Sequence, residues 1–363
     1  MTLSRKLLFL VLLAAIALAA VFFIPAFPSH EKRTANLIAR FMKRHDIPGA
    51  VVAYGSAGKA PTLRAFGLAD PETGREMTVS DRFKLASLSK PITSAAMLAL
   101  IRKDDEIALA TTLASLFPQV ARSVDPRMAD VTIEHLLHHS GGWDRAASFD
   151  AFFLTGAELR ARLDLDAPST QGCAPYADAM LALPLDADPG AAYAYSNIGY
   201  CWLGRIIEKR TGMSYEAAAR QLLSGRLDGL TMENGDVTVA HAVAQQEGEF
   251  AALRPEIIAA AGGWIGSAED YLAFAAGPLD EDVFLSPGFA EGTQYYGLGW
   301  RIWNIDEGTV LTHYGSMPGT FSLVARSANG STLVALFNGR PENDLGGFQE
   351  LFNGLMSRGL LGE

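Results

Sequence analysis

Serine–lysine pairs are the first groups in this sequence whose type and spacing could support catalysis. Three lysines have a serine three residues earlier, in the pairs Ser29/Lys32, Ser56/Lys59 and Ser87/Lys90. On a helix this spacing places both side chains on one face. A lysine whose pKa is lowered by burial can then take the proton of the serine hydroxyl and make it a nucleophile.

Context separates the three pairs. Only Ser87 and Lys90 open a long apolar helical pattern, residues 89–102. Pro91 is tolerated in the first turn of a helix but disfavours helical geometry at the residue before it, so we expect an irregular start. The alternative is a serine that only caps an ordinary core helix.

Two later segments favour the catalytic interpretation. Tyr195-Ser196-Asn197 is the only Tyr-x-Asn in the chain, and it offers a phenol that can relay a proton and an amide that can hold a carbonyl or a lysine. His313-Tyr314-Gly315 follows a strand-like run, and a glycine there would let a substrate approach the backbone closely.

The apolar pattern indicates how these residues are positioned. Strand-like runs occur near the N-terminus and again near the C-terminus, at residues 50–54, 62–66, 296–303, 309–312, 320–325 and 332–337. Helical patterns cover residues 34–44 and most of the middle, and residues 348–356 read as a closing helix. We therefore expect an α+β fold, with one antiparallel sheet built from both termini, flanking helices and a mainly helical insert beside it. The site would lie in the cleft between sheet and insert.

The order of these motifs resembles the penicillin-recognising serine hydrolases, a family that includes class C β-lactamases, D-Ala-D-Ala carboxypeptidases and related esterases. The likeness rests on the segments that carry the motifs and their flanks: residues 70–75, 83–93, 131–142, 189–215, 261–270 and 296–300. It runs from about residue 35 to residue 340 and leaves out the N-terminus and residues 144–188. The resemblance implies a β-lactamase/transpeptidase-like fold, an α/β sandwich.

The resemblance also implies roles. Ser87 would form an acyl-enzyme, while Lys90 and Tyr195 would manage the protons. Asn197 would orient the substrate or Lys90. The backbone N–H groups of Ser87 and Ser316, next to Gly315, would form the oxyanion hole.

One residue departs from the pattern of the β-lactamases in this family. They carry a lysine where this chain has His313. A histidine is mostly neutral at pH 7, so this departure favours esters, neutral amides or N-terminal D-residues over substrates that carry a carboxylate.

The function expected is therefore a serine hydrolase that acts on a small-molecule or peptide ester or amide. A β-lactamase or D-Ala-D-Ala carboxypeptidase is the alternative within the family. An alternative of another class is a penicillin-binding or sensor-like module that does not turn over.

A metal site is the alternative interpretation of His135, His138 and His139, whose spacing on a helix could chelate a metal ion. These residues also fit a structural segment of the family, and we expect neither a metal nor a cofactor. The net charge of −10 carries no basic block and argues against nucleic-acid binding.

The N-terminus differs from the rest of the chain. Residues 7–24 are uninterrupted apolar sequence preceded by Arg5 and Lys6. We expect residues 1–28 to be a signal-anchor, or alternatively a cleaved signal peptide, so that the remainder is exported to the periplasmic or extracellular side. Residues 29–363 would form the hydrolase domain, with a sheet part at about 30–85 and 260–363 and a helical part at about 86–259.

Cys173 and Cys201 are the only cysteines. In an oxidising compartment they could form a disulfide. Two separate buried thiols are an equal alternative, since sequence spacing does not give the distance between the two residues.

Overall fold

The computed structural model describes residues 30–166, 172–241, 255–290, 292–306, 308–357 and 359. The apolar run at residues 7–24 lies outside them. Among the residues described, no helix has the length and apolar character that crossing a membrane requires.

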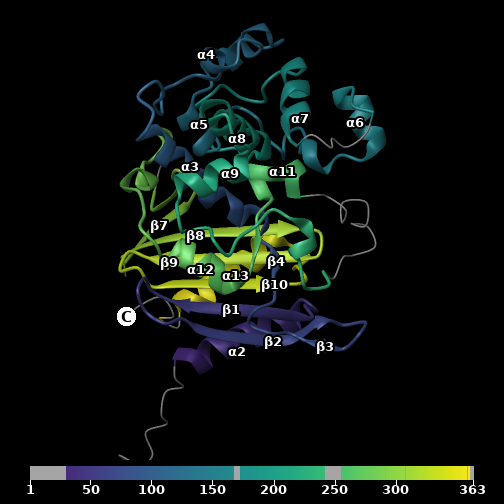
Figure 1. Cartoon of the computed structure of the whole chain (residues 1–363), viewed down its shortest axis with the longest axis vertical. Helices are drawn as coiled ribbons and strands as arrows, with labels where there is room; N and C mark the ends of the chain where they lie inside the picture. The colour runs from purple at the N-terminus through teal and green to yellow at the C-terminus, as the bar shows by residue number, and fades with distance from the viewer. Residues whose placement is uncertain are drawn as a thin grey trace, which may run out of the picture.

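An eight-stranded antiparallel sheet forms the base of the part of the chain that the structure describes (Figure 1). Its order is β3-β2-β1-β10-β9-β8-β7-β6. The strands are β1 (Gly49–Gly55), β2 (Thr62–Asp70), β3 (Arg75–Glu76), β6 (Gln294–Tyr296), β7 (Arg301–Ile305), β8 (Gly308–Met317), β9 (Thr320–Ser327) and β10 (Thr332–Phe337). N-terminal β1 pairs with C-terminal β10, so the expected sheet from both ends of the chain is confirmed.

Helices lie on both faces of this sheet and beyond one of them, and in Figure 1 α4 to α8 lie above it. They are α2 (His30–Arg44), α3 (Ser89–Ile101), α4 (Leu113–Leu116), α5 (Ile133–Leu137), α6 (Gly156–Leu163), α7 (Ala174–Ala179), α8 (Asn197–Thr211), α9 (Tyr215–Leu222), α11 (Pro255–Gly262), α12 (Ala268–Ala275) and α13 (Asp344–Met356). The short strands β4 (Phe83–Lys84) and β5 (Ile265–Gly266) pair near the start of α3.

The side chains of the central strands explain the layers. In β1, Ala50 and Val52 belong to one hydrophobic cluster, together with residues of α2 and α13. Val51 and Ala53 belong to the other, which includes α3, α8 and α12. Successive side chains of a strand point to opposite faces, so a strand that is apolar throughout is buried on both.

The single strand expected over residues 296–303 is wrong. Tyr296 ends β6 and Arg301 begins β7, and the two strands pair antiparallel. Gly299, with φ +84°, makes the turn between them, and a Cβ on Gly297 would lie 2.2 Å from the Val283 carbonyl oxygen. Aromatic residues on both sides of Gly297 and Gly299 made the turn look like part of one continuous strand in the sequence. At the third motif, β8 also runs longer than expected and contains the whole of residues 313–315.

Candidate active site

Ser87 lies in a tight 3₁₀ turn, Ala86–Leu88, immediately before α3. Ala86 has φ +49°, in the left-handed region that costs a residue with a side chain about 1–3 kcal/mol. Strand β8 passes directly beside this turn. A Cβ on Gly315 would lie 2.8 Å from Ser87 N and 2.6 Å from the Leu85 carbonyl oxygen, so only glycine fits there.

The Ser87 hydroxyl has two partners. Lys90 Nζ lies 3.2 Å from Ser87 Oγ, and the Tyr195 hydroxyl donates to the same oxygen at 2.7 Å. The structure thus brings both of the other residues predicted to be catalytic within hydrogen-bond distance of the Ser87 hydroxyl. Tyr195 lies in the loop before α8. The Ser196 hydroxyl caps the start of that helix by accepting the Gly199 N–H.

Lys90 is completely buried. Besides Ser87 it donates to Asn197 Oδ1 and to the Ala261 carbonyl oxygen, each at 2.7 Å. Burial lowers the pKa of Lys90 well below its usual range, while Asp150 opposes this shift and Arg145 adds to it. Burial raises the pKa of Tyr195 well above its usual range. Of this pair, Lys90 is therefore the group that loses its proton more readily.

Asn197, the first residue of α8, joins Lys90 to a carboxylate that sequence reasoning missed. Its Nδ2 donates to Asp150 Oδ2 at 2.6 Å, and Arg145 Nη1 lies 3.6 Å from the same oxygen. Both charged residues lie in the stretch that no motif covers. No periodicity or spacing in the sequence signals them.

His313 is neutral in this environment. Its Nδ1 donates to the Tyr314 carbonyl oxygen at 2.8 Å, so Nε2 accepts from the Tyr296 hydroxyl at 2.9 Å. Burial lowers the pKa of His313 to about 3, with Lys90 and Arg301 contributing in the same direction. Farther along β8, the Ser316 hydroxyl donates to Asp344 Oδ1 at 2.6 Å.

Two cavities meet at Ser87. The larger, of about 550 Å³, has a wall rich in tyrosine and contains His313 and Arg301. The smaller, of about 280 Å³, includes Asn197 and Arg340. Ser87 and Ser316 line both, as do Arg145 and Asp344. The serine therefore lies between two spaces, which suits a substrate with groups on both sides of the bond that is attacked.

The three clustered histidines take separate partners. His135 Nδ1 accepts the Thr132 N–H at 3.3 Å, and His139 Nδ1 accepts the Ser196 N–H at 3.1 Å. His138 Nδ1 bonds to the Tyr296 carbonyl oxygen at 2.9 Å. Within the described residues, no group of three or more His, Cys, Asp or Glu side chains is arranged to hold a metal ion.

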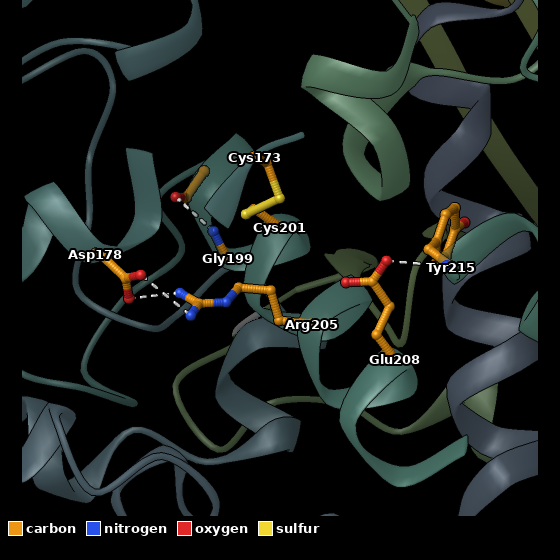
Figure 2. The surroundings of a disulfide bond; sticks show 8 residues. Cys173, Asp178, Gly199, Cys201, Arg205, Glu208 and Tyr215 are labelled. Carbon is orange, nitrogen blue, oxygen red and sulfur yellow. Dashed lines mark hydrogen bonds and ion pairs between the residues drawn. A yellow bond between two sulfur atoms is a disulfide. The ribbon is translucent and has the colours of Figure 1, made fainter. Parts of the chain in front are cut away.

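Cys173 and Cys201 form a disulfide, with their Cα atoms 5.9 Å apart (Figure 2). Cys201 lies on α8, one turn beyond Asn197, and Cys173 directly precedes α7. Figure 2 also shows Arg205 of α8 paired with Asp178 of α7, at 2.8 Å. The bond and the ion pair together fasten α7 to the helix that carries Asn197.

Comparison with known proteins identifies the family to which this chain belongs. Residues 34–352 match the sequence profile of the family described as Beta-lactamase. A probable fimbrial assembly protein FimD, serogroup H1, of Dichelobacter nodosus is 33% identical over 40% of this chain and 33% of its own length. Esterase EstB of Burkholderia gladioli is 33% identical over 50% of this chain and 46% of its own.

Among solved structures, the D-amino acid amidase from Ochrobactrum anthropi SV3 complexed with D-phenylalanine superposes with a TM-score of 0.71. It covers 91% of this chain and 100% of that one at 16% identity, which shows a shared fold. The first curated relatives are matched over only 33% to 46% of their own length. Since the family profile spans most of the sequence, the chain belongs to the beta-lactamase family of serine hydrolases.

Proposed function

We propose that this chain hydrolyses an ester or amide bond by transferring the acyl group first to Ser87 and then to water. The observation that carries the proposal is the position of Ser87 Oγ. It lies 3.2 Å from Lys90 Nζ and 2.7 Å from the Tyr195 hydroxyl, at the wall of a cavity of about 550 Å³. A nucleophile, a proton acceptor and room for a substrate coincide there.

The reaction has two halves. Ser87 Oγ forms a bond to the substrate's carbonyl carbon, its proton passes to the Lys90–Tyr195 pair, and the bond to the leaving alcohol or amine breaks as that group receives the proton. Water then attacks the acyl-enzyme, gives a proton to the same pair, and releases the acid while Ser87 regains its hydrogen.

Lys90 is the proton acceptor in this scheme and Tyr195 the relay. Burial lowers the pKa of the first and raises the pKa of the second, so a neutral amine is more accessible than a phenolate. Asn197 holds the amine through its Oδ1 at 2.7 Å.

The oxyanion of the tetrahedral intermediates would be held by the backbone N–H groups of Ser87 and Ser316. Support comes from the close approach of β8 to the Ser87 turn at Gly315. Donors of this kind contribute about 10²- to 10³-fold each to the rate.

The test uses the full chain purified in mild detergent, a fluorophosphonate probe and a p-nitrophenyl ester. We expect labelling and turnover in the wild type, and neither in Ser87→Ala. Ser56→Ala is the matched control, because Ser56 has a lysine three residues later but lies outside the site. Equal turnover in Ser87→Ala would refute the proposal. Labelling without turnover would favour a module that traps an acyl group.

We propose that the preferred substrate is neutral near His313, as in simple esters, amides or peptides with an N-terminal D-residue. The buried, uncharged imidazole offers no cation to a carboxylate. This substrate class is supported by the similarity to an esterase in sequence and to a D-amino acid amidase in fold. His313→Lys should raise kcat/KM for anionic acyl substrates relative to neutral ones. An unchanged ratio would remove His313 as the determinant.

We also propose that residues 7–24 hold the protein to a membrane and that the domain is exported. The apolar run after Arg5 and Lys6 supports this, and so does the buried disulfide, since such bonds persist in oxidising compartments. Added protease should digest the domain in intact spheroplasts. The mass of the N-terminal peptide separates an anchor from a cleaved signal. Protection from protease would contradict export.

A further inference from the structure

The Asp150 carboxylate is linked to Lys90 through the side chain of Asn197. Asp150 Oδ2 accepts from Asn197 Nδ2 at 2.6 Å, and Asn197 Oδ1 accepts from Lys90 Nζ at 2.7 Å. Arg145 reaches the same carboxylate from the cavity side, at 3.6 Å. The four residues form one line of contacts from the cavity wall to Ser87.

From this line of contacts we infer that Asp150 is a positioning residue: it fixes the Asn197 amide toward Lys90 and, balanced by Arg145, sets the charge of the amine. The inference rests on the proposed function, because it concerns how the Ser87 nucleophile is activated.

The geometry of an amide supports the first part. The Asn197 side chain has one acceptor oxygen and one donor nitrogen, related by a half-turn. With Nδ2 held by a carboxylate, Oδ1 must face Lys90. The flipped amide would place its oxygen against Asp150 and its N–H group against the lysine, which loses both hydrogen bonds. Truncation of Asp150 would leave a buried donor without an acceptor.

Charge supports the second part. The Asp150 side chain is only 9% exposed, so solvent screens its field weakly, whereas the Arg145 side chain is 46% exposed. Asp150 favours the protonated amine of Lys90 and Arg145 disfavours it. The two residues therefore act on Lys90 with opposite signs.

The other groups that face Lys90 are distributed over several elements. The α8 helix contributes Tyr200, whose ring centre lies 5.4 Å from Lys90 Nζ, and the loop before it contributes Tyr195, at 4.8 Å. From α11 the Ala261 carbonyl oxygen accepts from Lys90, and from α9 the Tyr215 hydroxyl bonds instead to Thr93 and Trp264. His139 and His313 feel the lysine's charge, and burial lowers the pKa of each. Among these described groups, Asp150 and Arg145 are the two whose full charges act on Lys90 in opposite directions.

The decisive experiment measures how the rate of Ser87 labelling by a fluorophosphonate depends on pH in the full chain. Asp150→Asn keeps the shape of the side chain and removes its charge, so the acid limb of the profile should move to lower pH. Arg145→Gln leaves Asp150 unbalanced, so the limb should move to higher pH. In the double variant the two shifts should largely cancel.

Two further variants separate positioning from folding. Asp150→Ala should lower the labelling rate about 10- to 100-fold, as loss of a partner that orients a reactive group does. Asp166→Asn, which makes the same change of charge at a fully exposed position, should leave the profile unchanged. Melting temperatures check that each variant is folded.

A profile that stays in place in both Asp150→Asn and Arg145→Gln, or moves the same way in both, would overturn the inference. This failure differs from failure of the proposed function. The function fails if Ser87→Ala retains turnover. The inference alone fails if Ser87→Ala is inactive while the two charge variants do not move the limb in opposite directions.

Discussion

The two sides of this site are built in opposite ways. One side, here termed the framework, comprises the Ser87 turn, the first turns of α3 and α8, and β8. The other, here termed the insert segment, comprises residues 144–166 and 172–188. In the framework the chemical groups are buried on regular elements: Lys90 is 0% exposed and Asn197 4%.

The insert segment instead consists of short helices and loops. It contributes Arg145, which is nearly half exposed, to the wall of both cavities. It contacts the framework through the Asp150–Asn197 hydrogen bond, and the Cys173–Cys201 disulfide joins it to the next turn of α8. The difference teaches that reactive groups need elements fixed by a core, whereas charge and shape around them can come from a loop. Changes in the framework should therefore have the largest effects on rate. Changes in the insert segment should mainly alter pH dependence or stability, and of these only truncation of Asp150, which contacts Asn197, should also lower the rate.

The largest expected effect is at Lys90 in the framework. Lys90→Met fills the buried volume without a base, so kcat/KM for an ester should fall about 10³- to 10⁴-fold while the chain remains folded. Steady-state kinetics and a thermal melt measure the two quantities. A loss below tenfold would mean that another group accepts the Ser87 proton.

Tyr195→Phe comes next. The variant keeps the ring, which packs on His139 with ring centres 4.3 Å apart, and removes only the hydroxyl that donates to Ser87. We expect kcat/KM to fall about 10²-fold, the lower end for a proton relay. A wild-type rate in this variant would remove Tyr195 from the chemistry, although the framework around it would be unchanged.

The pH profile of the wild type should show the pKa directions of the framework. Acylation needs neutral Lys90, whose pKa is lowered by burial, so activity should rise with pH through a value well below that of an ordinary lysine. The pKa of Tyr195 is raised, so formation of a phenolate should not reduce activity at moderately alkaline pH. An acid limb at the ordinary lysine pKa would contradict the proposed burial effect.

The smallest effect on rate is expected from the disulfide of the insert segment. Cys173→Ala/Cys201→Ala should lower the free energy of unfolding by about 3 kcal/mol, because the bond closes a long loop. The value of kcat/KM should be nearly unchanged. Chemical denaturation and ester kinetics provide the comparison, with reduced wild type as control. A large loss of rate at unchanged stability would show that the bond positions Asn197 directly.

The sequence predicted most of the framework because its helices and strands have clear local sequence patterns. An apolar helical pattern follows Ser87, and strand-like apolar runs lie near both ends of the chain. These features act locally, so they are legible without the structure. The sequence pattern missed the full length of β8 and the turn between β6 and β7, where aromatic residues on both sides resemble one continuous strand.

The insert segment could not be predicted in the same way. Asp150 bonds to a residue 47 positions later, and the loop that carries it has no periodic pattern. Whether Cys173 and Cys201 are bonded depends on the distance between their Cα atoms, 5.9 Å, which spacing in the sequence does not contain. Such contacts are decided by the packing of α7 on α8 and become visible only in three dimensions.

The most direct test of the account is the covalent intermediate itself. The full chain is mixed with a p-nitrophenyl ester, quenched in acid during turnover, digested and examined by mass spectrometry. We predict one acyl group on the peptide that contains Ser87, present during turnover and gone when the ester is exhausted. Turnover with no acyl group on that peptide, or with one elsewhere, would contradict it.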